Sequence, residues 1–125
     1  MNNKSSANPI VQKVEKPWGY ELIWAKTSRY VGKVLHITKG HRLSLQFHRL
    51  KEETFYLQTG LMTLLLENDQ GVVEEHTLRP GDVRHVVPNR KHRMIAVENC
   101  DVFEVSTTEL DDVVRLEDSY GRTEK

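Results

Sequence analysis

The sequence predicts an all-β fold that consists of a single domain. From Ile10 onward the chain is a series of short segments rich in β-branched and aromatic residues, separated by turn residues. No long stretch shows the 3.6-residue periodicity of an amphipathic helix. A length of 125 residues suits one domain, and many short strands joined by Gly/Pro turns are typical of a sandwich or barrel. The expected strands are Ile10–Val14, Tyr20–Ala25, Tyr30–Thr38, Leu43–His48, Thr54–Gln58, Leu61–Glu67, Val72–Leu78, Val83–Val87, His92–Val97 and Val102–Ser106.

The connections and the two ends of the chain complete this outline. Arg79-Pro80-Gly81-Asp82 has the residues of a type II turn, because proline sets φ at the second position and glycine accepts a positive φ at the third. Glu109–Leu116 is expected to form a short helical turn near the C-terminus. The polar residues 1–9 are expected to form a disordered tail, so that the domain spans residues 10–122.

Composition excludes several classes of partner. Eighteen Lys and Arg side chains balance eighteen Asp and Glu, so no global positive field favours nucleic acid or an anionic membrane. No apolar stretch approaches the ~20 residues that span a bilayer, and the N-terminus lacks the apolar core of a secretory signal. The single cysteine, Cys100, cannot form an internal disulfide, which suits a reducing compartment. We therefore expect a cytoplasmic protein.

Leu43–His48 is the segment whose orientation the alternation leaves open. One face carries three polar side chains, Ser44, Gln46 and His48, and the other carries Leu43, Leu45 and Phe47. The ordinary arrangement places the apolar face in the core, whereas a barrel with a polar site inside it reverses the two faces. Strand alternation alone does not decide between them.

Four residues around this segment have the chemistry and spacing of a metal site. Gln46 and His48 are two positions apart and therefore project from the same face of one strand. Glu53 begins the next strand, and His92 opens a later one. An amide oxygen, a carboxylate and two imidazoles suit one divalent ion, with Zn as first choice and Fe, Mn, Ni or Co as alternatives. Four protein ligands would leave positions open for a substrate.

The intervals between these residues resemble the two motifs of the cupin superfamily. The first motif, Gly-x5-His-x-His-x3-4-Glu-x6-Gly, is matched from Gly40 through Gln46-Phe47-His48 and Glu53 to Gly60, with Gln46 in place of the first histidine. The second, Gly-x5-Pro-x-Gly-x2-His, is matched from Gly81 through Val87-Pro88-Asn89 to His92. Asn89 replaces a glycine, a mild change because asparagine tolerates left-handed backbone. The resemblance implies a double-stranded β-helix, or jelly-roll barrel, with Gln46, His48, Glu53 and His92 as ligands.

Within the cupins, the sequence resembles the cupin domain of type II mannose-6-phosphate isomerases, and we expect a stand-alone small cupin. Ser-Leu-Gln-x-His ends at His48, Lys-Pro-Trp-Gly begins at Lys16, and Tyr30–Gly40 resembles the lysine-bearing strand before the first motif. A closing stretch, residues 112–122, resembles Asp-Ile-Val-Arg-x-Glu-Asp-x-Tyr-Gly-Arg. Lys51 stands where this family has an arginine.

The resemblance implies an aldose–ketose isomerase that acts on a hexose phosphate such as mannose 6-phosphate. Such chemistry needs a metal that polarises sugar oxygens, a base that moves a proton, and cations that bind phosphate. The base is open between His85, Lys51 and a metal-bound hydroxide. Lys33, Lys51, Arg93 and Arg122 are the candidate cations for the phosphate, and Lys51 is the first choice for contact with substrate near the metal. The expected catalytic residues are Lys51, His85 and Arg122. The substrate-binding candidates are Trp18, Tyr20, Lys33 and Arg93, although core packing is an equal alternative for the two aromatic residues.

Two other functions are compatible with the same motifs. A non-catalytic, carbohydrate-binding or regulatory cupin would keep the metal only to hold its ligand. An iron-dependent oxygenase usually has His-x-His in the first motif, and Gln46 argues against it. The fold alone does not choose, because barrels of this kind host many chemistries.

The orientation of Leu43–His48 also bears on assembly. If the polar face points into the barrel, Leu43, Leu45 and Phe47 point out of it, and uncovered apolar patches are rare on monomers. Ile10–Val14 could cover this face, either in its own chain or in a neighbouring one. We therefore expect a two-fold symmetric homodimer with these side chains at or near its interface.

Overall fold

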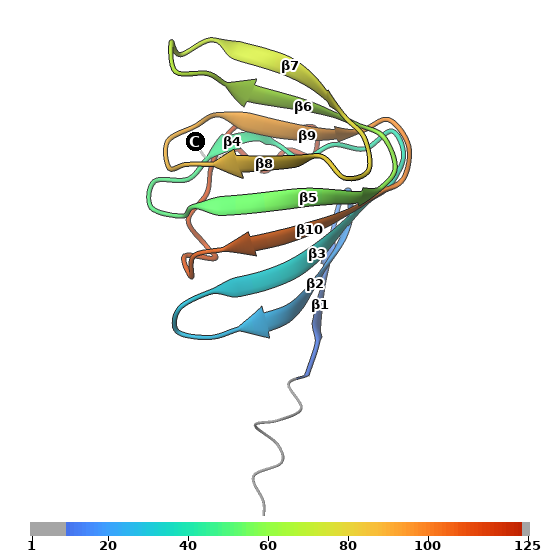
Figure 1. Cartoon of the computed structure of the whole chain (residues 1–125), viewed down its shortest axis with the longest axis vertical. Helices are drawn as coiled ribbons and strands as arrows, with labels where there is room; N and C mark the ends of the chain where they lie inside the picture. The colour runs from blue at the N-terminus through green and yellow to red at the C-terminus, as the bar shows by residue number, and fades with distance from the viewer. Residues whose placement is uncertain (1–9, 124–125) are drawn as a thin grey trace, which may run out of the picture.

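A computed structural model describes residues 10–123, in which all the regular structure is β-strand (Figure 1). The strands are short because glycine, proline and asparagine turns interrupt them. They are β1 (Gln12–Lys16), β2 (Gly19–Lys26), β3 (Val31–Ile37), β4 (Leu45–Phe47), β5 (Glu53–Thr59), β6 (Met62–Glu67), β7 (Val73–Leu78), β8 (Val83–Val86), β9 (His92–Ala96), β10 (Cys100–Ser106) and β11 (Val114–Glu117). The all-β prediction is confirmed.

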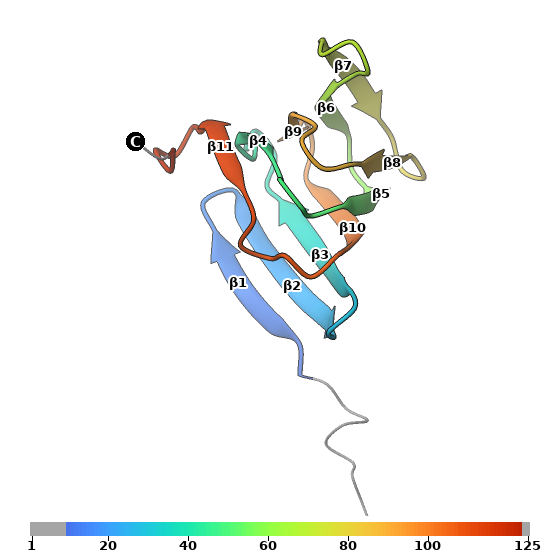
Figure 2. The same cartoon turned by 90° about the vertical axis from the view of Figure 1, so that its left-hand side faces the viewer.

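The strands form two antiparallel sheets that enclose one core. The first has the order β1-β2-β3-β10-β5-β8 and the second β11-β4-β9-β6-β7 (Figures 1 and 2). Strands far apart in the sequence become neighbours in this order, as when β10 pairs with both β3 and β5. The buried apolar side chains come from both sheets, among them Leu35, Phe55 and Val102 from the first and Leu64 and Met94 from the second. The core therefore fills the space between the sheets.

The turns follow the expected local chemistry. Gly81 has a φ of 98°, and the amide of Asp82 donates to the carbonyl of Arg79 at 3.0 Å, which closes the Arg79–Asp82 turn. Asn89 has a φ of 68° and is the one non-glycine residue with positive φ in the described part of the chain. Asparagine thus supplies the left-handed residue at the position where the cupin motif has glycine.

The C-terminal region differs from the prediction. The expected helical turn at Glu109–Leu116 is wrong, because Val114–Glu117 forms β11 and pairs antiparallel with β4 (Figure 2). Two β-branched residues, Val113 and Val114, suit a strand, and the free edge of β4 offers backbone partners that a helical turn does not have. The expected tail at residues 1–9 lies outside the described residues.

The orientation of Leu43–His48 is resolved in favour of a polar interior. Ser44 and His48 are buried, whereas Leu45 and Phe47 are half-buried on the other face. The expectation that Leu43 points outward is wrong: Leu43 packs against the core. Regular strand geometry begins only at Leu45, so the alternation of side chains does not extend back to Leu43.

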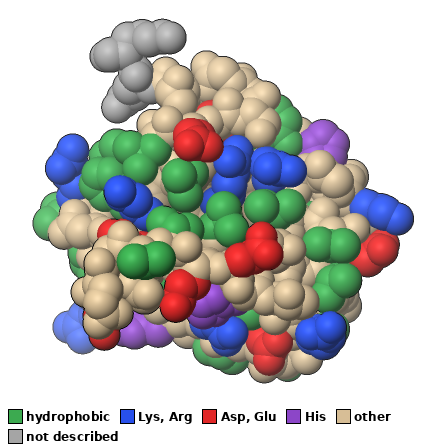
Figure 3. All heavy atoms as spheres, turned by 90° about the horizontal axis from the view of Figure 1, so that it is seen from above, with side chains coloured by type: hydrophobic (Ala, Val, Ile, Leu, Met, Phe, Trp, Pro, Cys, Tyr) green, Lys and Arg blue, Asp and Glu red, His purple; other side chains and the backbone are tan. Residues whose placement is uncertain are grey.

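The surface of the molecule carries charges of both signs. In Figure 3, basic and acidic side chains are interspersed with apolar ones over the face that is shown, in agreement with the formal net charge of zero. Among residues 10–123, no helix is long and apolar enough to cross a bilayer.

Candidate metal centre and its pocket

Three potential metal ligands converge at one end of a pocket between the sheets. His48 follows β4, Glu53 begins β5 and His92 begins β9. Glu53 Oε2 lies 3.1 Å from His92 Nε2 and 3.6 Å from His48 Nε2, and the ligand atoms of the three residues lie within 4.8 Å of one another. All three side chains are buried. This donor set fits a divalent ion of the zinc or iron type.

Hydrogen bonds to the backbone orient both imidazoles. His48 Nδ1 donates to the carbonyl of Asp112 at 2.6 Å, and His92 Nδ1 donates to the carbonyl of Arg90 at 2.9 Å. A carbonyl oxygen can only accept, so Nδ1 carries the proton in both rings. Each Nε2 therefore points toward Glu53 and is the ring atom that would face an ion, with Nδ1 held by a backbone carbonyl as in most metal-binding histidines.

Gln46 is the fourth candidate, and it lies beside the other three. It is the cross-strand partner of His92 between β4 and β9, so the two side chains stand next to each other on the inner face. Its Nε2 donates to Ser44 Oγ at 2.9 Å. This bond fixes the orientation of the amide and leaves the oxygen as the atom available to an ion. The four residues proposed from sequence therefore line one pocket.

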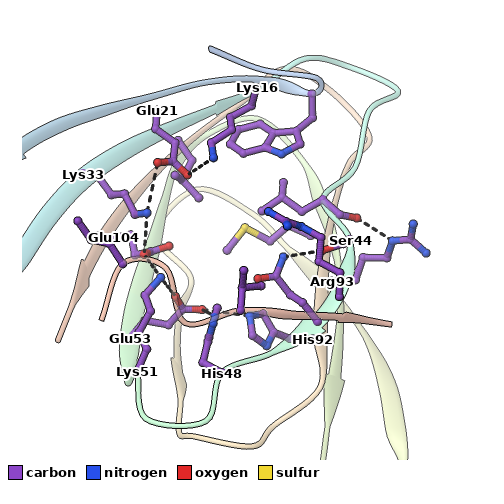
Figure 4. Close-up of a pocket in the computed structure, with 18 of the residues that line it drawn as sticks. Lys16, Glu21, Lys33, Ser44, His48, Lys51, Glu53, His92, Arg93 and Glu104 are labelled. Atoms are coloured by element: carbon purple, nitrogen blue, oxygen red, sulfur yellow. Dashed lines mark hydrogen bonds and ion pairs between the residues drawn. The ribbon is translucent and has the colours of Figure 1, made fainter. Parts of the chain in front are cut away.

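The pocket has a wall of alternating charges (Figure 4). Glu21 lies between Lys16 and Lys33, at 4.0 and 3.4 Å. Glu104 Oε2 lies 3.8 Å from Lys33 Nζ and 3.2 Å from Lys51 Nζ, and Lys51 Nζ lies 3.2 Å from Glu53 Oε1. This charged wall, Lys16-Glu21-Lys33-Glu104-Lys51-Glu53, leads directly to the two histidines.

The buried members of the charged wall shift one another's pKa. Burial opposes the charge on Lys51, but Glu104 and Glu53 outweigh this effect and raise the pKa of its ammonium. Burial also opposes ionisation of Glu53, but its bonds with His48 and His92 and the charge of Lys51 hold its pKa well below the usual range. The pKa of Glu104 is raised, first by burial and then by the negative charge of Glu53. Lys51 is therefore held in its charged form, whereas Glu104 takes up a proton more readily than Glu53 does.

Three arginines, Arg93, Arg115 and Arg122, also line the pocket. Arg93 Nε donates to the carbonyl of Leu43 at 2.8 Å, and burial and then the charge of Arg42 lower the pKa of Arg93. Asp118 holds Arg122 through two bonds of 2.9 Å. Arg115 Nε is buried and has no hydrogen-bond partner among residues 10–123. A guanidinium with an unpaired, buried N–H is suited to an anionic ligand.

Five of the seven candidate catalytic and substrate-binding residues chosen from sequence line the pocket, and two do not. Trp18, Lys33, Lys51, Arg93 and Arg122 line the pocket, and Trp18 also belongs to the core.

Tyr20 and His85 lie elsewhere. Tyr20 stacks on His36 with ring centroids 5.0 Å apart, and His85 is exposed and contacts Glu52. Both are at outward positions of their strands, next to inward neighbours such as Glu21 and Val86. The structure thus does not support Tyr20 as a sugar-stacking residue or His85 as the base.

Sequence reasoning missed Glu104, Arg115, Lys16 and Asp112. A signal was present for Glu104: it shares the inward face of β10 with Cys100, Val102 and Ser106, and a charged residue on a buried strand face is unusual. Lys16 and Arg115 lie in stretches that resemble the isomerase family, Lys-Pro-Trp-Gly and residues 112–122. The neighbouring sequence gives no indication that either side chain lines the pocket. The contact of Asp112 with His48 joins positions 64 residues apart, so local sequence carries no signal for it.

Comparison with known proteins shows the family to which the chain belongs. A sequence model of the family described as "Mannose-6-phosphate isomerase C-terminal" matches residues 2–118. The xanthan biosynthesis protein XanB of Xanthomonas campestris pv. campestris (strain B100) is 31% identical over 115 residues, and the mannose-1-phosphate guanylyltransferase of Escherichia coli (strain K12) is 31% identical over 116 residues. In each case the match covers 90% of this chain and 24% of the relative. The chain thus spans about a quarter of the length of these relatives.

A solved structure supports the fold. KdgF from Halomonas sp. superposes with a TM-score of 0.70 at 21% sequence identity, covering 84% of this chain and 93% of the other. The cupin fold predicted from the two motifs is confirmed.

Proposed function

Because the chain belongs to the family of mannose-6-phosphate isomerase C-terminal domains, we propose that it binds a hexose phosphate such as mannose 6-phosphate at a divalent metal ion and interconverts its aldose and ketose forms. One observation carries the proposal. The metal-ligand cluster and three arginines, one of which has a buried Nε without a hydrogen-bond partner among residues 10–123, line the same pocket. A sugar phosphate needs both features, one for its reacting end and one for its phosphate.

The residues present fit a metal ion. His48, His92 and Glu53 would hold it, with the amide oxygen of Gln46 as a fourth ligand, and zinc is the first choice among Zn, Fe, Mn, Ni and Co. When bound, the ion would supply Lewis-acid polarisation of the sugar oxygens at C1 and C2.

The arginine side of the pocket is the proposed phosphate site. Arg93, Arg115 and Arg122 offer planar N–H groups that match phosphate oxygens in pairs. Asp118 keeps Arg122 in place with two hydrogen bonds, so little side-chain freedom is lost when a phosphate binds. The lowered pKa of Arg93, caused by burial and by Arg42, indicates a place where an added negative charge is favourable.

Glu104 is the proposed proton carrier. In the isomerisation a base takes the proton from C2 of the aldose and returns it to C1, while the hydroxyl proton of C2 moves to the oxygen of C1. The raised pKa of Glu104 brings its carboxyl closer to neutral pH, where it can both accept and return a proton. Lys51 stays charged and would stabilise negative charge on the sugar oxygens as the proton leaves carbon.

The cytoplasm is the proposed location, in keeping with the free and buried thiol of Cys100.

The test is a metal assay followed by proton exchange. Purified protein is first analysed for bound metal. The loaded protein is then incubated in D₂O with mannose, fructose and glucose 6-phosphates while NMR follows deuterium at C2 of the aldoses and at C1 of the ketose. Exchange with at least one sugar phosphate supports the isomerase, and Glu104→Gln should abolish it while metal content stays unchanged.

The same experiment identifies the alternatives. Binding of a sugar phosphate without exchange would overturn catalysis and favour the non-catalytic carbohydrate-binding cupin. If the protein shows no binding of a sugar phosphate and no exchange, the proposed function as a whole is overturned. Unphosphorylated mannose is the control ligand, and it should bind more weakly because it lacks the group that the arginines recognise.

A further inference from the structure

The carboxylate of Asp112 holds the loop that carries the metal ligands. Its Oδ1 accepts the amide of Arg49 at 3.0 Å, and its Oδ2 accepts the amides of Leu50 and Lys51 at 2.6 and 2.9 Å. These three consecutive donors belong to the turn between β4 and β5, which has His48 on one side and Glu53 on the other. One side chain thus satisfies all three of these amides.

The main chain of the same residue contacts a metal ligand. The carbonyl of Asp112 accepts the Nδ1 hydrogen of His48 at 2.6 Å. Asp112 therefore acts on His48 twice, once through the imidazole and once through the three residues that follow it. A carboxylate bonded to several amides is stabilised in its charged form, and the pKa of Asp112 is accordingly lowered, chiefly by its bond with the amide of Leu50.

Asp112 also begins the segment that closes the pocket. Its neighbours Leu110, Val113 and Arg115 line the pocket, and β11 follows it and pairs with β4. The ligand-bearing strand β4 has one registered pair with β9, Gln46 with His92, and three with β11. The position of β4 therefore depends on the C-terminal segment as well as on the rest of its sheet.

From these contacts we propose that Asp112 is a positioning residue that couples residues 110–122 to the metal centre. The coupling is reciprocal: an ion that fixes His48 stabilises the C-terminal segment, and the docked segment raises the affinity for the ion. The inference rests on the metal centre of the proposed function but not on the isomerase reaction. Loss of such an outer partner of a ligand typically weakens metal binding on the order of 10–100-fold.

The experiment measures Zn²⁺ affinity and amide exchange in the complete chain, without any sugar. Chelator competition gives the Zn²⁺ dissociation constant of the wild type, Asp112→Ala, Asp112→Asn and the control Asp111→Ala. Asp111 is the exposed neighbour and has no side-chain hydrogen bond among the described residues. Asp112→Ala removes the carboxylate that holds the β4–β5 turn but keeps the carbonyl that accepts from His48. It should therefore weaken Zn²⁺ binding about 10-fold, the lower end of that range. Asp112→Asn keeps one acceptor oxygen and should fall between Asp112→Ala and the wild type, and Asp111→Ala should match the wild type.

Hydrogen–deuterium exchange tests the reciprocal effect. Zn²⁺ should slow amide exchange in residues 113–117 of the wild type and of Asp111→Ala, and should do so much less in Asp112→Ala. A lower melting temperature of Asp112→Ala with unchanged Zn²⁺ affinity and unchanged protection would overturn the proposal, because the role would then be structural only. If Asp112→Ala does not fold, Asp112→Asn decides by the same criteria. A wild type that binds no Zn²⁺ would overturn the metal centre and this coupling together, whereas absent sugar exchange with the Zn²⁺ effects intact would overturn only the isomerase.

Discussion

Lys51 Nζ and Glu104 Oε2 lie 3.2 Å apart in the interior of the barrel, and Glu53 lies at the same distance from Lys51 on its other side. The three side chains are buried, and Lys33 is the other cation near Glu104. Glu104 thus joins Lys33 and Lys51, two of the three lysines of the charged wall, to a central strand of the first sheet.

Removal of Glu104 should destabilise the fold. Glu104→Ala leaves two buried ammonium groups with one partner fewer, and breaking a buried pair from one side costs about 3–5 kcal/mol. Urea denaturation measures the change. The control is Glu52→Ala, which removes an exposed partner of His85 and should change the free energy of unfolding by at most about 1 kcal/mol. Equal effects of the two substitutions would contradict the importance of the charged wall for stability.

The metal ligands can be tested against histidines of the same chain. His48→Ala and His92→Ala should remove most bound metal, whereas His36→Ala and His76→Ala should leave it in place, because these two contact surface partners. Glu53→Gln should weaken binding more than Gln46→Glu, since Glu53 is the one anionic ligand of the proposed set. Elemental analysis after dialysis gives the metal content. The same content in all four histidine variants would eliminate the centre as described.

The arginines should control affinity for the phosphate. Arg115→Ala and Arg122→Ala should each weaken binding of mannose 6-phosphate by roughly ten- to hundred-fold, since a charge-assisted contact contributes about 1.5–3 kcal/mol. Metal content should stay the same. Isothermal titration measures the affinities, with Arg79→Ala as the exposed control in the type II turn. If both variants bind as tightly as the wild type, the phosphate lies elsewhere.

The contribution of the Asp118–Arg122 pair to stability should be lost at low pH. The bonds from Arg122 lower the pKa of Asp118 from its ordinary value of 3.8, against the opposing effect of burial. The folded state therefore holds this proton less readily than the unfolded chain, so the pair stabilises the fold at neutral pH and is lost as the pH falls through the lowered pKa. Arg122→Met should raise the pKa of Asp118 toward 3.8. Carboxyl ¹³C NMR can follow this titration, and an unchanged value would show that Arg122 does not determine it.

The homodimer stays a prediction, but the structure suggests another interface. One row of cross-strand neighbours on the outer face of the first sheet is apolar, Leu22, Val34, Phe103, Tyr56 and Val83. Phe103 and Tyr56 are 43% and 40% exposed and stack on each other. An exposed apolar patch of this kind favours contact with a partner. The interface expected from sequence lies on the other sheet, and one of its three residues, Leu43, packs against the core instead.

Light scattering tests this interface. The wild type should have twice the 14.5 kDa mass of one chain, and the double variant Tyr56→Ser/Phe103→Ser should be a monomer. Leu50→Ser, at an exposed position in the β4–β5 turn, is the control and should stay dimeric. A wild type of 14.5 kDa at micromolar concentration would reject the dimer.

Local features of the sequence predicted segments that correspond to β1 to β10, the turns, and Gln46, His48 and Glu53 of the candidate metal centre. Alternating side chains and Gly/Pro turns act within a few residues, so they are readable without the fold. Gln46, His48 and Glu53 are close in the sequence, and their spacing places them together on one strand and the start of the next. His92 required the second motif, since only resemblance connects it with the others.

The tertiary structure alone decided how distant residues combine around that centre. Glu104 reaches Lys51 because β10 pairs with β5, and β11 is a strand because the edge of β4 needed a partner. Tyr20 and His85 have suitable chemistry, but the register of their strands points them away from the pocket. Asp112 meets His48 across 64 positions of sequence. Strand pairing over such separations depends on the packing of the whole chain. For this reason the candidate metal ligands could be proposed from the sequence, whereas their supporting partners could not.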